Sequence, residues 1–117
     1  MNLKKYDVVL LDLDPPKGHV QAGVRPAVIA QSNLFNRRAS TVLIVPLTSN
    51  SNKLFPCEFW IEPSKKNGLG SPSRFLGSQL TALDKEFIIK KIGRLEAGYH
   101  HLVQEALGVA LDWDDSF

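Results

Sequence analysis

The sequence has one cysteine and three histidines, and this shortage excludes several kinds of site. Cys57 has no second cysteine with which to form an internal disulfide, as is typical of proteins in a reducing compartment. A zinc cluster built on cysteines is excluded for the same reason. His100 and His101 are adjacent, so on a helix their side chains diverge by about 100° and cannot bind one ion from one face. We therefore expect no metal site.

Long apolar runs and familiar nucleotide-binding patterns are also missing. No stretch approaches the ~20 apolar residues that a membrane helix needs. The first residues carry Asp7, Asp12 and Asp14, which a signal peptide would not. Neither G-x-G-x-x-G nor G-x-x-x-x-G-K-[ST] occurs, and no spacing suggests a hydrolase triad. We expect a cytoplasmic protein with no membrane association and no cofactor.

Basic residues are absent from the last part of the chain. All fourteen lysines and arginines lie at or before Arg94, together with seven of the twelve acidic residues. Residues 95–117 hold the other five acidic residues and neither lysine nor arginine. This asymmetry favours a basic surface that faces a polyanion and a separate face for other contacts. The alternative is an ordinary mixed surface with an acidic tail.

The 117 residues are expected to form a single domain spanning residues 1–117, with one hydrophobic core. Apolar, β-branched runs predict a series of short strands, and residues 33–39 allow at most one helical turn. The predicted strands are 6–13, 25–31, 40–48, 57–61 (as a hairpin partner), 75–80 and 88–92, with a turn around residues 83–85. Pro46 interrupts the third run, so we expect pairing to break there and to free residues 47–50.

The last element differs from the others because its apolar residues recur at helical spacing. From Gly98 this pattern predicts one amphipathic helix, with His100 and His101 at its surface. Short strands followed by one helix predict a mainly β fold. We expect a small, strongly curved antiparallel sheet or partly open barrel, covered by the C-terminal helix.

Residues 15–26, PPKGHVQAGVRP, form a polar loop between two apolar strands, and they raise the question of a site. Arg25 precedes a proline, which favours an extended backbone there, and its guanidinium suits a phosphodiester. Thr48 and Ser49 follow Pro46 and can donate hydrogen bonds to the same group. An unperturbed histidine has a pKa near neutral, a property that suits His19 to proton transfer. A surface arginine, an uninvolved loop histidine and ordinary turn chemistry remain the alternatives.

The order of these segments resembles the MazF/PemK/Kid family of toxins from type II toxin–antitoxin systems. That family shows a strand ending in D-L-[DS]-P, followed by G-[SH]-E-Q-x-G-x-R-P; here the stretch reads DLDPPKGHVQAGVRP. TVLIVPLTS at 41–49 is similar to its V-x-[VP]-[LVI]-T-[ST] segment. SQLTALD at 78–84 is similar to its [DE]-Q-[VIP]-x-[ST]-[IL]-D stretch, and KKIGRL with a closing helix completes the match.

The resemblance implies an SH3-like barrel of the CcdB/PemK type, usually a homodimer. It implies a sequence-specific, metal-independent endoribonuclease that cleaves single-stranded RNA, or mRNA, and is neutralised by a MazE/PemI-like antitoxin. The ribose 2′-hydroxyl attacks phosphorus, leaving a 2′,3′-cyclic phosphate and a 5′-hydroxyl. Arg25, Thr48 and His19 match the family's catalytic positions. The residues expected to contact RNA are Lys17, Gln21, Ser49, Lys53, Arg74, Ser78 and Gln79.

The sequence departs from the family pattern where two carboxylates are expected. Val20 stands for the glutamate of G-x-E-Q, Ser78 for the acid before the later glutamine, and Leu76 for an arginine of Kid-like members. Loss of a proton acceptor can lower a rate by roughly 10²–10⁴-fold. Either His19 and Arg25 suffice, or Glu58 or another acid substitutes, or the chain is a weak or altered nuclease.

Two further functions stay open beside the nuclease. One is a CcdB-like toxin that inhibits DNA gyrase by binding it, with Trp113 and Phe117 as an anchor pair. These two aromatic residues are also suited to covering a dimer or sheet edge. The other is a catalytically weak RNA-binding relative, which would retain RNA without cutting it, with a steep dependence on salt.

Overall fold

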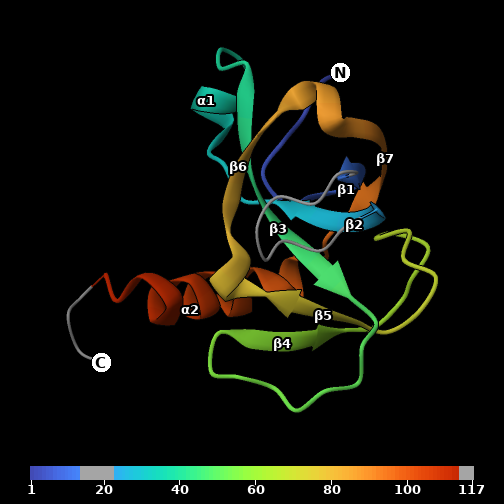
Figure 1. Cartoon of the computed structure of the whole chain (residues 1–117), viewed down its shortest axis with the longest axis vertical. Helices are drawn as coiled ribbons and strands as arrows, with labels where there is room; N and C mark the ends of the chain where they lie inside the picture. Colours follow the sequence, from blue (N-terminus) through green and yellow to red (C-terminus); the bar gives the residue numbers. More distant parts are fainter. Residues whose placement is uncertain (14–22, 114–117) are drawn as a thin grey trace.

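The computed structural model describes residues 1–13 and 23–113, and its framework is a mainly antiparallel β fold (Figure 1). Within these residues two α-helices and three short 3₁₀-helices accompany the strands. The strands are β1 (Asp7–Leu13), β2 (Gly23–Ile29), β3 (Thr41–Thr48), β4 (Glu58–Ile61), β5 (Ser73–Leu76), β6 (Thr81–Asp84) and β7 (Ile88–Arg94). The helices are α1 (Asn33–Asn36), η1 (Gly77–Gln79), η2 (Lys85–Phe87), η3 (Ala97–Tyr99) and α2 (His100–Leu111).

The strands form one strongly curved sheet in the order β4-β5-β3-β2-β1-β7, with β6 paired to β3 off this path. All the ladders are antiparallel. Within the described residues β4 pairs only with β5, β6 only with β3 and β7 only with β1, so the sheet keeps unpaired edges and does not close. The predicted mainly β class with a C-terminal helix is confirmed, in its open rather than its closed form.

Strand β3 changes its neighbour halfway along its length. Its first half, Thr41–Ile44, pairs with β6, whereas Leu47 and Thr48 pair with Phe75 and Arg74 of β5. Pro46 lies between these two ladders, where a missing donor is tolerated. The strand therefore runs through the proline. The expectation that residues 47–50 leave regular pairing was wrong for Leu47 and Thr48, because β5 takes over where β6 ends.

Two other local predictions were wrong. Residues 81–84 form β6, and the turn predicted around 83–85 begins only at η2. The strand predicted over 75–80 stops at Leu76, because the chain enters η1 at Gly77. Gly77 donates a backbone hydrogen bond to the Cys57 carbonyl, and a β-carbon at this position would lie 2.4 Å from that oxygen. Only glycine permits so close an approach.

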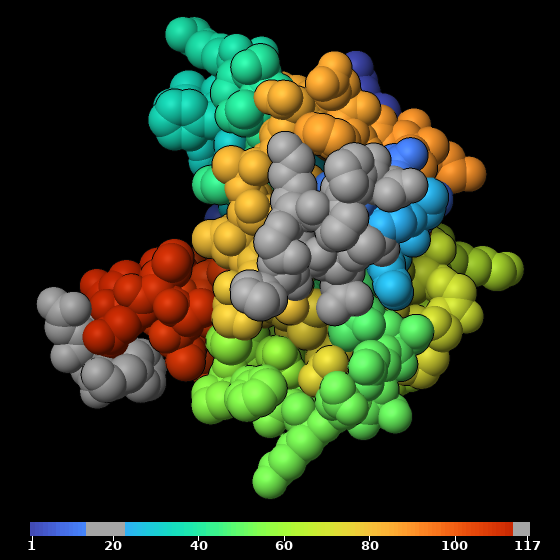
Figure 2. All heavy atoms as spheres, in the orientation of Figure 1, coloured from blue at the N-terminus to red at the C-terminus, as the bar shows by residue number. Residues whose placement is uncertain are grey.

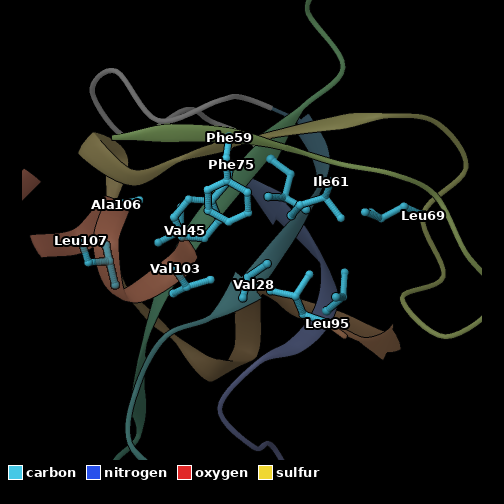
Figure 3. Packing of buried hydrophobic residues seen from close by; sticks show 12 residues of the cluster. Val28, Val45, Phe59, Ile61, Leu69, Phe75, Leu95, Val103, Ala106 and Leu107 are labelled. Carbon is cyan, nitrogen blue, oxygen red and sulfur yellow. The ribbon is translucent and has the colours of Figure 1, made fainter. Parts of the chain in front are cut away.

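Helix α2 covers one face of the sheet and completes the main core (Figure 3). Val103, Ala106 and Leu107 of the helix pack among buried strand residues, which include Phe59 and Phe75 with ring centroids 4.7 Å apart. A second buried cluster, built on residues such as Leu11 and Ile44, fills the other side of the sheet. The predicted amphipathic helix is confirmed, beginning two residues after Gly98.

The two adjacent histidines differ in their surroundings. His101 is exposed, as expected. His100 is half-buried, because its ring stacks on Tyr6 at 3.6 Å between centroids and its Nε2 lies 3.1 Å from the Leu95 carbonyl oxygen. The expectation of two surface histidines was therefore wrong for His100, which joins the start of α2 to the segment before β1.

Candidate functional site

A cavity of about 350 Å³ lies where β1, β2, β3 and β7 meet the connection between β4 and β5. We call it the Arg25 cavity. Its described lining includes two cationic side chains, those of Arg25 and Lys90, and hydroxyls from Thr48, Ser49 and two serines of the β5 region. Apolar residues of β1 and β2 complete its wall. No carboxylate occurs among the described residues that line it, so the cavity suits an anion.

Arg25 is the third residue of β2, with its Cα opposite that of Leu11 in β1. The β2–β3 ladder ends at Ala27 and Pro46, and continuing that register by two residues on each strand brings Arg25 level with Thr48. Arg25 is half-buried and has contacts of its own. Sequence and sheet geometry thus bring the predicted arginine and threonine, 23 positions apart in the chain, to the same cavity.

Thr48 ends β3 and is 5% exposed. Its Oγ1 accepts a hydrogen bond from the backbone N–H of Asn50 at 3.2 Å, a local contact that fixes the side chain where the strand turns into a loop. Ser49 is exposed beside it and also lines the cavity. The hydroxyls expected to act together with Arg25 therefore share its cavity.

Lys90 is a cavity residue that the sequence did not single out. It lies on the edge strand β7, exposed, with its Cα opposite that of Leu10. Lys90 lies in the segment KKIGRL, which is part of the family resemblance. That segment alone does not show which of its two lysines faces the cavity. Lys91 instead contacts the buried Asp7, with Nζ 3.3 Å from Oδ2.

The β4–β5 connection closes the cavity from one side, and Gly68 holds it close to β7. Gly68 has φ +73°, and a β-carbon there would lie 2.1 Å from the Ile92 carbonyl oxygen. Both the backbone conformation and the close approach require glycine. Ser71 and Ser73, which follow in the same connection and in β5, add two hydroxyls to the lining.

The other predicted RNA contacts are dispersed. His19, Lys17 and Gln21 lie outside the described residues. Lys53 is exposed on the β3–β4 connection, which protrudes at the lower edge of the view in Figure 2. Ser78 is exposed and Gln79 half-buried on η1. None of these last three is among the described residues that line the Arg25 cavity.

Arg74 lies beneath the β3–β4 connection with its guanidinium turned inward. Its Nη1 donates to Glu58 Oε1 at 3.1 Å and lies 3.4–3.5 Å from the carbonyl oxygens of Lys53 and Asn52. The side chains of Arg74 and Glu58 are only 7% and 5% exposed. Glu58, which was open as a substitute catalytic acid, is therefore committed to an ion pair that supports this connection.

The described residues hold no group of three or more histidine, cysteine, aspartate or glutamate side chains placed to bind a metal ion. Over the same part of the chain, no helix has the length and apolar character to cross a bilayer. The arrangement that remains is a curved, open antiparallel sheet with one covering helix and a cationic, hydroxyl-lined cavity. It defines a small β protein with a cavity on the sheet whose lining suits an anion.

Comparison with known proteins agrees with this class. Residues 4–111 match the family described as PemK-like, MazF-like toxin of type II toxin-antitoxin system. The chain is 36% identical over 110 residues to the endoribonuclease MazF of Staphylococcus epidermidis, which covers 93% of this chain and 91% of that protein. The chain therefore belongs to the family of PemK-like, MazF-like toxins.

Solved structures show the same fold. MazF from Deinococcus radiodurans superposes with a TM-score of 0.79 at 25% identity, covering 96% of this chain and 98% of that one. A mycobacterial endoribonuclease in complex with its cognate antitoxin gives a TM-score of 0.76 at 23% identity, covering 94% and 95% of the two chains. The CcdB-like alternative is not favoured, because the family match spans nearly the whole sequence.

Proposed function

We propose that this chain is a sequence-specific endoribonuclease that cleaves single-stranded RNA and is held inactive by a cognate antitoxin. The observation that carries the proposal is the shared cavity of Arg25 and Thr48 in a chain of the MazF-like family. The name of its Staphylococcus epidermidis relative, an endoribonuclease, supports the activity, and the mycobacterial complex supports an antitoxin partner. A cytoplasmic homodimer formed from a single domain is part of the same proposal.

In the proposed reaction the 2′-hydroxyl oxygen bonds to the neighbouring phosphorus while the bond from phosphorus to the 5′-oxygen breaks. The attacking hydroxyl gives up its proton and the leaving 5′-oxygen gains one. The Arg25 guanidinium stabilises the charge that grows on the phosphoryl oxygens, and Thr48 donates to the same group. Lys90 adds a second positive charge at the cavity wall. His19 exchanges protons with the two ribose oxygens.

The absence of two carboxylates lowers the rate of RNA cleavage that we expect. Val20 and Ser78 replace two acids of the family pattern, and Glu58 is paired with Arg74. We therefore infer a slower enzyme than family members that carry both acids, with His19 as the remaining proton acceptor. A relative that retains RNA without cutting it is the second candidate function, and this pair of substitutions favours it.

The test is incubation of the protein with single-stranded RNA in the presence of a chelator. The expected products carry 2′,3′-cyclic phosphate and 5′-hydroxyl ends, identified by mass spectrometry. Arg25→Ala should lower the rate of cleavage by about 10²–10³-fold, while Arg38→Ala, which changes an exposed arginine outside the cavity, should leave it unchanged. RNA that is retained but never cut, even at high protein concentration, would favour the second candidate.

A further inference from the structure

A second hollow lies at the end of the molecule that carries α1 and the N-terminus, far from β4 and β5 in Figure 1. We call it the N-terminal pocket. It has a volume of about 600 Å³ and is lined by Asn2, Leu3, Lys4, Asn33, Arg37 and Arg94. Three of these side chains are cationic, and no carboxylate occurs among the described residues that line it. It shares no described lining residue with the Arg25 cavity.

Arg94 is held in place at one corner of its guanidinium. Nη1 donates to Asp7 Oδ1 at 3.2 Å and to the Lys5 carbonyl oxygen at 3.1 Å. The Asp7 side chain is fully buried, whereas that of Arg94 is 43% exposed. Both contacts use a single nitrogen, so the fork is oriented by the protein while its other donors remain available at the pocket. A guanidinium fixed in this way is suited to paired hydrogen bonds with a phosphate.

Asn33 is oriented by two hydrogen bonds to its carbonyl oxygen. Oδ1 accepts from the backbone N–H of Lys5 at 2.8 Å and from Asn36 Nδ2 at 3.2 Å. The same amide carries the Nδ2 donor group, and Asn33 is an exposed residue of the pocket lining. The backbone of Lys4 is fixed in turn, since its N–H donates to Asp7 Oδ2 at 2.8 Å. Preoriented donors distinguish this pocket from a scatter of surface lysines.

The local charge balance remains positive. Asp7 contacts both Arg94 and Lys91, with 3.3 Å between Lys91 Nζ and its Oδ2, so one buried carboxylate is shared by two cations. Lys4 and Arg37 are exposed and add two more charges at the rim. An anion entering the pocket therefore meets donors and uncompensated positive charge together.

We propose that the N-terminal pocket is a second phosphate-binding site, which holds a backbone phosphate of single-stranded RNA outside the Arg25 cavity. That the bound phosphate belongs to RNA rests on the proposed function. That the pocket binds phosphate rests on the residues of the pocket alone. Arg94 and Arg37 contact the phosphate oxygens, Asn33 donates a neutral hydrogen bond, and Lys4 supplies long-range attraction. A strand long enough to reach this site gains affinity that a short strand lacks.

The experiment measures binding of single-stranded oligonucleotides made wholly of 2′-deoxynucleotides, which lack the attacking hydroxyl, by fluorescence anisotropy. Arg37→Gln should weaken binding of a long strand by about tenfold, as expected for one charge-assisted contact. It should also reduce the slope of log K against log salt by roughly 0.7. Arg38→Gln is the matched control, since Arg38 is adjacent, exposed and outside the pocket lining; it should keep the wild-type affinity.

Asn33→Asp provides an independent variant. It keeps the acceptor that Lys5 and Asn36 require, and it replaces only the outward donor with a negative oxygen. Binding of the long strand should fall while the melting temperature stays near that of the wild type. If Arg37→Gln and Arg38→Gln bind alike, or if Asn33→Asp folds and binds normally, the proposal is overturned.

A titration with inorganic phosphate tests whether the pocket binds free phosphate or a phosphate of RNA. Titrated alone, it should shift the backbone amide resonances of Lys4, Lys5 and Asn33 in a ¹H–¹⁵N spectrum. If it does so but long strands bind no better than short ones, the site serves free phosphate and the RNA assignment fails. A wild-type protein that binds long strands through Arg37 but cuts no RNA would refute the proposed nuclease and leave the pocket assignment intact.

Discussion

Arg74 and Glu58 form an ion pair away from solvent, with 3.1 Å between Nη1 and Oε1, on the two strands β5 and β4. Arg74 is also the cross-strand partner of Thr48. The pair joins the two strands of the β4–β5 hairpin, and β5 in turn pairs with the strand that presents the cavity threonine. Its carbonyl contacts extend this support to the β3–β4 connection.

Removing one member of this pair is expected to destabilise the protein. Glu58→Gln leaves the Arg74 charge buried without a counter-charge, which costs about 3 kcal/mol in comparable pairs. Urea unfolding followed by circular dichroism measures the change. The double variant Glu58→Gln/Arg74→Met should recover part of the loss, since it removes both charges. A double variant less stable than Glu58→Gln would contradict this account.

Arg25 is expected to act through its fork and not through charge alone. Arg25→Ala should lower kcat/KM for single-stranded RNA by about 10²–10³-fold, the usual cost of losing a donor that stabilises transition-state charge. Arg25→Lys keeps the charge but not the paired donors, so it should recover little of the rate. Single-turnover cleavage assays distinguish these cases. Equal rates for Arg25→Ala and Arg38→Ala would show that Arg25 is only a surface charge.

Thr48 is expected to need its hydroxyl. Thr48→Val keeps the volume of the side chain but removes the hydroxyl that is proposed to donate to the phosphoryl group and that accepts from the Asn50 N–H. Cleavage should therefore fall by about tenfold or more. Thr48→Ser retains the oxygen and should retain most of the activity. Thr41→Val, at the exposed start of the same strand, is the control. Comparable losses in Thr48→Ser and Thr48→Val would point to packing as the cause.

Lys90 is expected to bind substrate without taking part in proton transfer. Lys90→Gln should raise KM and reduce the salt slope of RNA binding by roughly 0.7, because one phosphate contact is lost. Lys66→Gln is the control, since Lys66 is an exposed lysine on the β4–β5 connection that does not line the cavity. A variant with altered kcat and unchanged KM would show that Lys90 acts on the chemical step instead.

The sequence predicted the class of fold and the two central residues of the cavity because both follow from local patterns. Alternating and β-branched runs located most of the strands, and the motifs ending at Arg25 and Thr48 marked two neighbouring strand ends. Lys90 was missed because neither its sequence position nor its charge separates it from Lys91. As consecutive residues of β7 the two lysines point to opposite faces of the strand, and only the assembled sheet shows which face carries the cavity.

The role of Arg74 was also hidden, for a related reason. In the sequence alone, Arg74 is one of several basic residues near a predicted RNA-binding surface. Its burial depends on Glu58, 16 positions earlier, which faces it only because β4 pairs with β5. The contact between Arg74 and Glu58 depends on which strands become neighbours in the sheet. The pattern of apolar residues within a strand does not determine its neighbours.

The exchange of neighbours along β3 has a consequence for how the protein opens. β3 pairs with β2, β5 and β6, so no local fluctuation frees it without separating three ladders. Its amide hydrogens should exchange with solvent almost as slowly as global unfolding allows, whereas those of the edge strands β4 and β7 exchange sooner. The cavity is therefore asymmetric in its dynamics. Thr48 ends the strand that three ladders hold, and Lys90 lies on an edge strand.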